Sequence, residues 1–150
     1  MAAQISPENV DLARAGYAAI EHYYATGDEG PVRRHIEQFM HPDCVLSAGP
    51  EVFTEGVWTG HDGVLRFMKN QREVFRDMWI EPLDFIEADE EWLVVPIRFG
   101  GTARHTGMDI ELTPVHAFRF SDDRVTDFRI FLSLEDALAA IGAQPRATDP

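Results

Sequence analysis

The sequence predicts an α+β domain in which helices cover one face of a mainly antiparallel sheet. Three segments whose apolar residues recur at helical spacing come first, and four extended segments follow. Helices grouped before strands favour this arrangement over the alternating units of a parallel sheet. With 150 residues, 45% of them hydrophobic, we expect one domain over residues 1–150 with a sizeable core.

The first helix is expected over residues 7–26. The letters SPE at positions 6–8 supply a hydroxyl cap, a proline for the first turn and an acidic residue near the helix start. Gly27 is suited to end the helix. One apolar stripe follows from the helical spacing: Ala13, Tyr17, Ile20 and Tyr24.

Two further helices are predicted before the strands begin. The second runs from Pro31 to about Met40 and is stopped by Pro42. The third opens at TGHD, residues 59–62, which has the Thr-x-x-Asp form of a capping box and precedes apolar residues at helical spacing. Between these two helices, HPDCVLSAG at 41–49 predicts a short strand.

The second half of the chain reads as extended segments. Four strands are expected within residues 79–88, 91–103, 108–120 and 124–133. A short helix over SLEDALAAIG then closes the domain, and a loose tail is expected from about residue 143.

Strand register places a histidine on the inner face of the sheet. A hairpin turning near RHTG would set Ile97 opposite His116 and Phe99 opposite Pro114. Because side chains alternate along a strand, His116 then faces the same way as the apolar rows. We therefore treat His116 as a candidate pocket residue.

The last hairpin could close with two or three loop residues, and that choice decides which way the final strand faces. A three-residue loop turns Phe128, Ile130 and Leu132 inward. A two-residue loop would instead bury Asp127 and Arg129, which would cost several kcal/mol if these charged groups were unpaired. We therefore expect the three-residue loop.

The same choice leaves Val115, Arg129 and Phe131 on the outer face. An uncovered apolar group there predicts a homodimer through the outer sheet face, with Phe131 near its centre.

Composition excludes several classes of partner. Asp and Glu total 26 against 13 Lys and Arg, and the formal net charge of −13 would repel nucleic acid and anionic lipid. No apolar run approaches the roughly 20 residues of a membrane span, and the start lacks the pattern of a signal peptide. The single cysteine, Cys44, cannot form an internal disulfide. We expect a soluble cytoplasmic protein.

Several motifs together resemble the SnoaL-like polyketide cyclase branch of the nuclear transport factor 2-like superfamily. They are FMHPDCVL before the first strand, WTGHDGVLRFM at the third helix and VHAFRFSDDRVTDFRIF in the closing hairpin. The resemblance covers the chain from about Val10 to Gly142. It implies a cone-shaped barrel, in which three N-terminal helices and a strongly curved sheet enclose a pocket, and it usually implies a dimer.

Known catalytic sets of this superfamily are not reproduced in the chain. By position, the oxyanion-hole aspartate of ketosteroid isomerases falls on His116, the base aspartate near Ala48 and the tyrosine near Ile20. The last-strand aspartate of limonene epoxide hydrolases falls near Ile130. The resemblance therefore implies neither activity. Many SnoaL-like proteins carry a histidine at the strand position of His116.

The candidate catalytic residues are His116, Tyr17 and Tyr24. An imidazole whose pKa burial can tune suits a general acid or base acting on an enolisable carbonyl, and a phenol can donate to a developing oxyanion. The alternative is structural: a neutral core imidazole bonded to a backbone carbonyl or a tyrosine, beside core aromatics. The residues expected to bind the ligand are Trp58, Ile97, Phe99, Phe118, Phe128 and Ile130.

Two function classes follow from these residues. The first is binding of a small, largely apolar and carbonyl-bearing molecule with cofactor-free proton transfer, as in cyclisation, isomerisation or dehydration. The second is a non-catalytic ligand-binding or dimerisation domain. The six histidines show no metal-binding spacing, so neither a metal nor another cofactor is expected.

Overall fold

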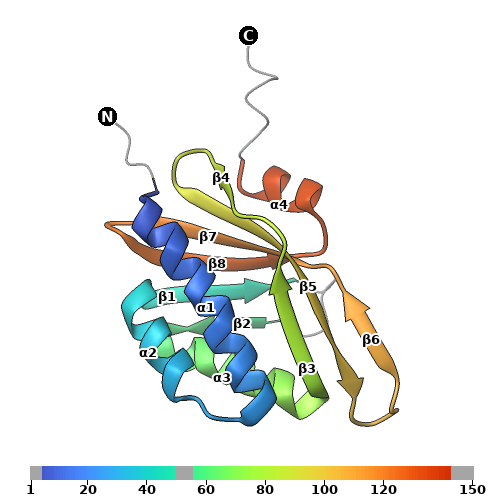
Figure 1. Cartoon of the computed structure of the whole chain (residues 1–150). Helices are drawn as coiled ribbons and strands as arrows, with labels where there is room; N and C mark the ends of the chain where they lie inside the picture. The colour runs from blue at the N-terminus through green and yellow to red at the C-terminus, as the bar shows by residue number, and fades with distance from the viewer. Residues whose placement is uncertain (1–4, 50–55, 143–150) are drawn as a thin grey trace.

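A computed structural model describes residues 5–49 and 56–142, in which four helices pack with one curled sheet (Figure 1). The expected tail from residue 143 lies outside the described residues. The helices are α1 (Pro7–Thr26), α2 (Gly30–Phe39), α3 (Gly60–Val74) and α4 (Leu134–Ala140). The strands are β1 (Met40–Ala48), β2 (Gly56–Thr59), β3 (Phe75–Pro82), β4 (Ile86–Ala88), β5 (Trp92–Ala103), β6 (Asp109–Leu112), β7 (Val115–Ser121) and β8 (Arg124–Phe131).

The start and end signals of α1 act as the sequence predicts. The Ser6 side chain accepts a hydrogen bond from the backbone N–H of Asn9 at 3.1 Å, which satisfies one of the free donors of the first turn. Gly27 ends the helix in the left-handed region with φ 79°. The expected capping box of α3 does not form, because Thr59 makes no side-chain cap bond and Asp62 instead lies 3.6 Å from Arg33.

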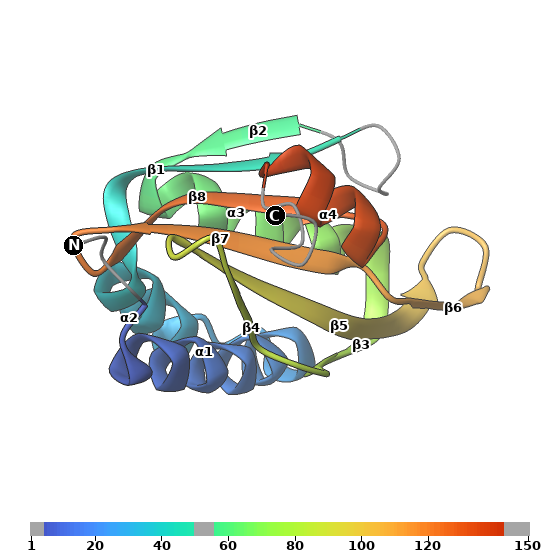
Figure 2. The same ribbon diagram turned by 90° about the horizontal axis from the view of Figure 1, so that it is seen from above.

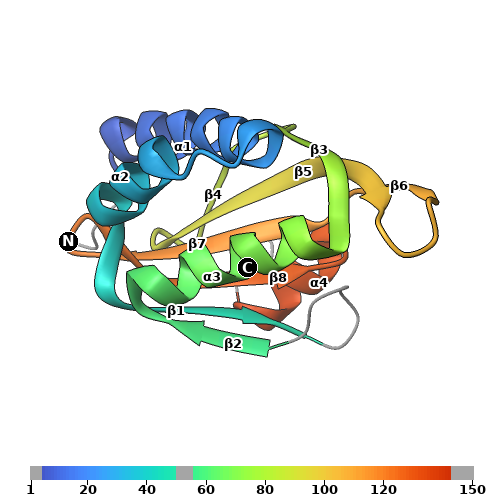
Figure 3. The same ribbon diagram turned by 90° about the horizontal axis from the view of Figure 1, so that it is seen from below.

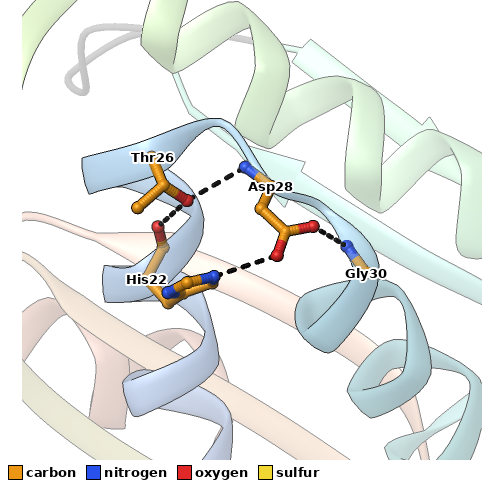
Figure 4. A network of polar contacts seen from close by, with 4 residues as sticks. All are labelled: His22, Thr26, Asp28 and Gly30. Carbon is orange, nitrogen blue, oxygen red and sulfur yellow. Dashed lines mark hydrogen bonds and ion pairs between the residues drawn. The ribbon is translucent and has the colours of Figure 1, made fainter.

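A polar network fixes the connection between α1 and α2 (Figure 4). Thr26 donates its hydroxyl to the carbonyl of His22 at 2.8 Å and accepts from the N–H of Asp28 at 3.0 Å. The Asp28 carboxylate accepts from the N–H of Gly30 at 3.1 Å and lies 3.1 Å from the His22 ring. These bonds define how α2 leaves the end of α1.

The sheet is mixed, curled and open. Its strand order is β2-β1-β8-β7-β5-β3, and β4 and β6 also pair with β5. Within the described ranges all pairs are antiparallel except β1 with β8. The outermost strands in this order, β2 and β3, do not pair with each other, so the expected barrel is an unclosed curl. The sheet nonetheless remains mainly antiparallel.

Helices α1, α2 and α3 pack inside the curl, where the main core lies (Figure 3). Their buried apolar residues meet those of the inner rows of β5, β7 and β8. Figure 2 shows α4 in front of β7 and β8, and Figure 3 shows α3 in front of them from the opposite side, so these helices cover opposite faces. None of the described helices has the length and apolar character that a membrane crossing requires.

The hairpin from β5 to β7 differs in register from the expectation by two residues. His116 pairs with Val95 rather than Ile97, and Phe99 pairs with Leu112 rather than Pro114. The reason is the turn, which joins Thr102 to Asp109 around residues 104–107. A displacement of two leaves every side chain on its predicted face, so His116 does lie on the inner side.

The last hairpin reaches the predicted facing by another route. Its loop has two residues, not three: Asp122 and Asp123, with φ of 53° and 65°, lie between the paired Ser121 and Arg124. Positive φ at both positions is typical of a tight hairpin turn that matches strand twist. A register shift between Arg119 and Phe120 then leaves one extra residue in β8 and reverses the alternation.

The outer face of β7 and β8 is partly covered rather than open. Val115 lies on this face as expected, but it is buried in a second apolar cluster with residues of α4. Phe131 is half-buried beside the same cluster. The expectation that Val115 would be an uncovered group is therefore wrong, because α4 folds back over that strand.

Candidate functional site

A cavity of about 410 Å³ lies between α1, α3 and the inner face of the sheet. Exposed residues such as Thr113 and Leu132 mark its mouth. Its lining includes Ile20, Tyr24, Phe67, Met68, Gln71, Ile80, Ile97, Phe99, Glu111, Leu112, Thr113, Pro114, His116, Phe128, Ile130 and Leu132. The wall is mostly aliphatic and aromatic with few polar groups, which is typical of a site for a small apolar molecule.

The structure brings four of the six predicted ligand-binding residues to this wall: Ile97, Phe99, Phe128 and Ile130. Phe118 instead lines a deeper hollow behind it. Trp58 is not among the described lining residues, and its ring packs edge-on against Phe67 at 4.9 Å. Trp58 therefore supports a wall residue rather than the cavity surface.

His116 and Tyr17 form a buried pair at the inner end of the cavity. The Tyr17 hydroxyl oxygen lies 2.8 Å from Nδ1 of His116, and the two side chains are 3% and 7% exposed. His116 lines the cavity, whereas Tyr17 stands behind it and lines only the deeper hollow. Of the three candidate catalytic residues, Tyr17 is thus separated from the cavity by His116.

Hydrogen-bond satisfaction decides how this pair shares its protons. Among the described residues, the Tyr17 hydroxyl bonds only to His116. If Nδ1–H donated to the phenol oxygen, the buried O–H would lack an acceptor at a cost of about 1–3 kcal/mol. A Tyr17 O–H that donates to Nδ1 leaves no such donor and puts the imidazole proton on Nε2.

The Nε2 atom of His116 retains accessible surface, because the described residues include no buried side-chain nitrogen or oxygen without a partner and none of them bonds to Nε2. Since His116 lines the cavity and its Nδ1 is directed at Tyr17, which does not line it, we infer that Nε2 faces the cavity. The ring is held by aromatic contacts: it stacks on Tyr17 at 5.8 Å and meets Phe128 edge-on at 4.9 Å. The geometry therefore presents a fixed Nε2 to whatever fills the cavity.

Burial sets the protonation states of these groups. Desolvation of the imidazolium lowers the pKa of His116 from 6.5 to about 3. Desolvation of the phenolate likewise raises the pKa of both Tyr17 and Tyr24. At neutral pH all three side chains are therefore uncharged, and each can donate a hydrogen bond. A base whose conjugate acid has so low a pKa is a weak proton acceptor, so donation suits His116 better than general base chemistry.

Tyr24 is a second polar group of the cavity wall. Its ring packs edge-on against Phe99 at 6.4 Å, and its hydroxyl makes no hydrogen bond within the described ranges. Since no described polar side-chain atom is both buried and unpaired, this hydroxyl also retains accessible surface. Tyr24 thus lines the cavity directly, as Tyr17 does not.

Charge is confined to the rim. Glu111 is the one described lining residue with a carboxylate, and that group is engaged by Arg98 at 2.8 and 3.1 Å. Arg98 also bonds Glu81 at 3.1 Å on the outer side of the sheet. No Lys or Arg side chain lines the cavity within the described residues. Such a wall suits an electrically neutral ligand, because nothing in it would compensate a buried charge.

The predicted ligand-binding set left out the lining residues of β6 and its junction with β7: Glu111, Leu112, Thr113 and Pro114. The predicted register did place Pro114 on the inner face. The signal that could have found them is the proline. A proline cannot donate to a ladder, and the chain leaves regular pairing at Thr113–Pro114, between β6 and β7. The backbone that deviates there forms the mouth of the cavity.

A hollow of about 20 Å³ extends behind the Tyr17–His116 pair towards α2. His35 borders it, stacks on Phe39 at 4.9 Å, and has its pKa lowered to about 4 by burial. No cluster of three or more potential metal-ligating side chains occurs among the described residues.

A family model described as SnoaL-like domain matches residues 20–128. The chain belongs to the SnoaL-like domain family. The matched region runs from α1 through β8 and contains most of the cavity wall, including His116. A comparison with curated proteins finds no match.

Several solved structures have the same fold as this chain. An NTF2-like protein of unknown function from Burkholderia pseudomallei is 23% identical with TM-score 0.69, and the alignment covers 92% of this chain and 100% of that one. TerC, co-crystallised with polyporic acid, is 22% identical with TM-score 0.67, covering 90% and 96%. A putative SnoaL-like polyketide cyclase from Jannaschia is 18% identical with TM-score 0.67, covering 94% and 96%. At these identities the likeness concerns the fold.

Proposed function

We propose that this SnoaL-like chain binds a small, largely apolar molecule that carries a carbonyl group, and that His116 donates its Nε2–H to the carbonyl oxygen. The observation that carries this proposal is a neutral imidazole, with one nitrogen bonded to Tyr17 and the other unbonded among the described residues, in a mostly apolar wall. Tyr24 supplies a second neutral donor on the same wall. The fold neighbour TerC was co-crystallised with polyporic acid, so the fold is compatible with ligand binding.

The chemistry that such a site favours is cofactor-free proton transfer next to the carbonyl. A hydrogen bond to the oxygen stabilises the negative charge that develops there when a neighbouring C–H is broken, and it does so more strongly in a dry cavity. Cyclisation, isomerisation and dehydration of carbonyl compounds share this step. In this proposal His116 and Tyr24 polarise the substrate and neither is ionised, so the proton that leaves carbon passes to solvent water at the cavity mouth.

A specific observation favours a second candidate, which is binding without catalysis. The proton that leaves carbon needs an acceptor, and Glu111, which has the one carboxylate among the described lining residues, is held by Arg98. A non-catalytic domain that uses His116 only to orient its ligand fits this arrangement.

Binding is tested with 2-acetylnaphthalene, a neutral two-ring ketone, followed by calorimetric titration. We expect one molecule per chain, and we expect Leu112→Trp to weaken binding at least about tenfold because its indole would grow into the cavity. Leu83→Trp is the matched control, since Leu83 is exposed and lies outside the described cavity lining. Equal binding by both variants would refute the site.

Catalysis is tested with the same ketone in D₂O. If the chain promotes proton transfer, NMR will show the acetyl methyl protons exchanging for deuterium faster with the wild type than with His116→Leu. Saturable binding without faster exchange would support the second candidate instead.

A further inference from the structure

We infer that Tyr17 is a positioning residue, which holds His116 as the neutral Nε2–H tautomer and thereby makes the cavity selective for a hydrogen-bond acceptor. The selectivity rests on the proposed function, because it concerns the ligand of that same cavity. The tautomer itself does not, because it is a property of the free protein. Tyr17 therefore acts through His116 and does not touch the ligand.

Tyr17 lies in the core behind His116. It projects from α1 into the core, is 3% exposed, and lies on the far side of His116 from the main cavity. Its ring is packed edge-on against Phe85 at 6.2 Å and stacked on His116. With the ring confined in this way, its hydroxyl is directed at Nδ1 at 2.8 Å.

The ring of His116 has no charged neighbour in the described part of the chain that would fix its tautomer. Three aromatic rings contact it: Tyr17, Phe118 and Phe128. No carboxylate or backbone acceptor bonds to either ring nitrogen within the described chain. The phenol is therefore the group that decides between the tautomers, and its O–H can be satisfied only by an unprotonated Nδ1.

The tautomer of His116 determines which ligand groups the cavity favours. An Nε2–H is a donor, so it favours a ketone, aldehyde or quinone oxygen, which has a lone pair to accept it. An ammonium group offers only N–H donors and would be left unpaired against it, at the cost of a buried charge. If the proton were on Nδ1 instead, the unprotonated Nε2 would accept a hydrogen bond, and the cavity would favour ligand groups that donate one.

Long-range ¹H–¹⁵N correlation spectra of the ¹⁵N-histidine-labelled protein test the tautomer without any ligand. At neutral pH we expect His116 to show a protonated Nε2 and an unprotonated Nδ1, with its signals assigned by their loss in His116→Gln. A wild-type spectrum with Nδ1 protonated would overturn the inference.

Tyr17→Phe is the deciding variant, because it keeps the ring and removes the hydroxyl. We expect both nitrogen shifts of His116 to move towards values averaged between the tautomers, whereas Tyr24→Phe, a matched change in the cavity wall, should leave them in place. A merely structural Tyr17 would alter melting temperature but not the tautomer. Unchanged ring shifts in Tyr17→Phe would refute the positioning role.

The affinities of two matched compounds test the ligand selectivity separately from the tautomer. In Tyr17→Phe, affinity for 2-acetylnaphthalene should fall about twofold, because only the fraction of chains with the Nε2–H tautomer is then competent to donate, while affinity for 2-ethylnaphthalene should not change. Equal losses for both compounds would contradict the selectivity. If the wild type shows the fixed tautomer but binds neither compound, the proposed function fails and the positioning role of Tyr17 stands.

Discussion

The imidazole of His35 lies directly against Gly16, in the middle of α1, where a β-carbon would overlap the ring. Alanine in place of glycine ordinarily stabilises a helix interior by about 0.5–1 kcal/mol. We expect the opposite sign here: Gly16→Ala should lower the free energy of unfolding by about 1–3 kcal/mol, because the core between α1 and α2 has no room for the methyl group. Chemical denaturation measures this difference.

The double variant Gly16→Ala/His35→Ala is the control for that prediction. Removing the ring should restore the ordinary helix-forming gain, so the alanine at position 16 should stabilise the His35→Ala background. If Gly16→Ala stabilises the wild-type chain by itself, the close contact between α1 and α2 is not as described.

Acid should destabilise the fold through His116, which is buried, and His35, which is half-buried. Burial lowers the pKa of His116 to about 3 and that of His35 to about 4, against 6.5 for an exposed histidine. As pH falls below about 6.5, the unfolded chain therefore binds protons that the folded chain does not, and the free energy of unfolding falls. From pH 7 to pH 4.5 we expect His116 alone to account for about 2 kcal/mol of this loss.

Denaturation of His116→Gln at the two pH values checks the assignment. Glutamine keeps size and hydrogen bonding but does not titrate, so this variant should lose less stability at pH 4.5 than the wild type. His105→Gln, an exposed histidine in the turn between β5 and β6, should behave as the wild type does. The same loss in all three proteins would exclude His116 as the source.

Local sequence rules predicted which face each inner side chain occupies, but not how the chain achieves it. The apolar alternation that turned Phe128 and Ile130 inward was right, because burying large apolar groups decides strand facing. The loop was wrong, because Asp122 and Asp123 form a two-residue turn and a bulge in β8 restores the facing. The bulge does shift the alternation, since the buried Val125 and Phe128 are three residues apart. Because the prediction rested on the facing of Phe128 and Ile130 alone, it assigned the shift to the length of the turn.

The sequence predicted several residues of the candidate site but not how their side chains contact one another. His116 and Tyr24 could be assigned to the inner layer from strand and helix periodicity. That Tyr17 bonds to Nδ1 of His116 depends on how α1 crosses the sheet, which no local pattern specifies. The position of Trp58 beside Phe67, outside the described wall, depends on the same packing between layers.

A homodimer through the outer sheet face remains our expectation for the assembly. On that face Phe131 is half-buried beside Val115 and α4, and the guanidinium of Arg129 lies 5.2 Å from the Trp92 ring centre. Static light scattering at micromolar concentration should give twice the chain mass, and Phe131→Glu should give monomers, because a carboxylate in an apolar interface is costly. Met108→Glu, at an exposed turn position, is the matched control. A monomeric wild type would contradict this prediction.

The hydrogen bond from His116 to a ligand carbonyl is the central claim, and the infrared C=O stretch of bound, ¹³C-labelled 2-acetylnaphthalene measures it most directly. The comparison variant is Tyr17→Phe/His116→Leu, which removes both members of the pair and so leaves no buried polar group unpaired. We predict a lower stretching frequency in the wild type than in this variant, because a donated N–H weakens the C=O bond. An identical frequency in the two proteins, with the ketone bound to both, would contradict the claim.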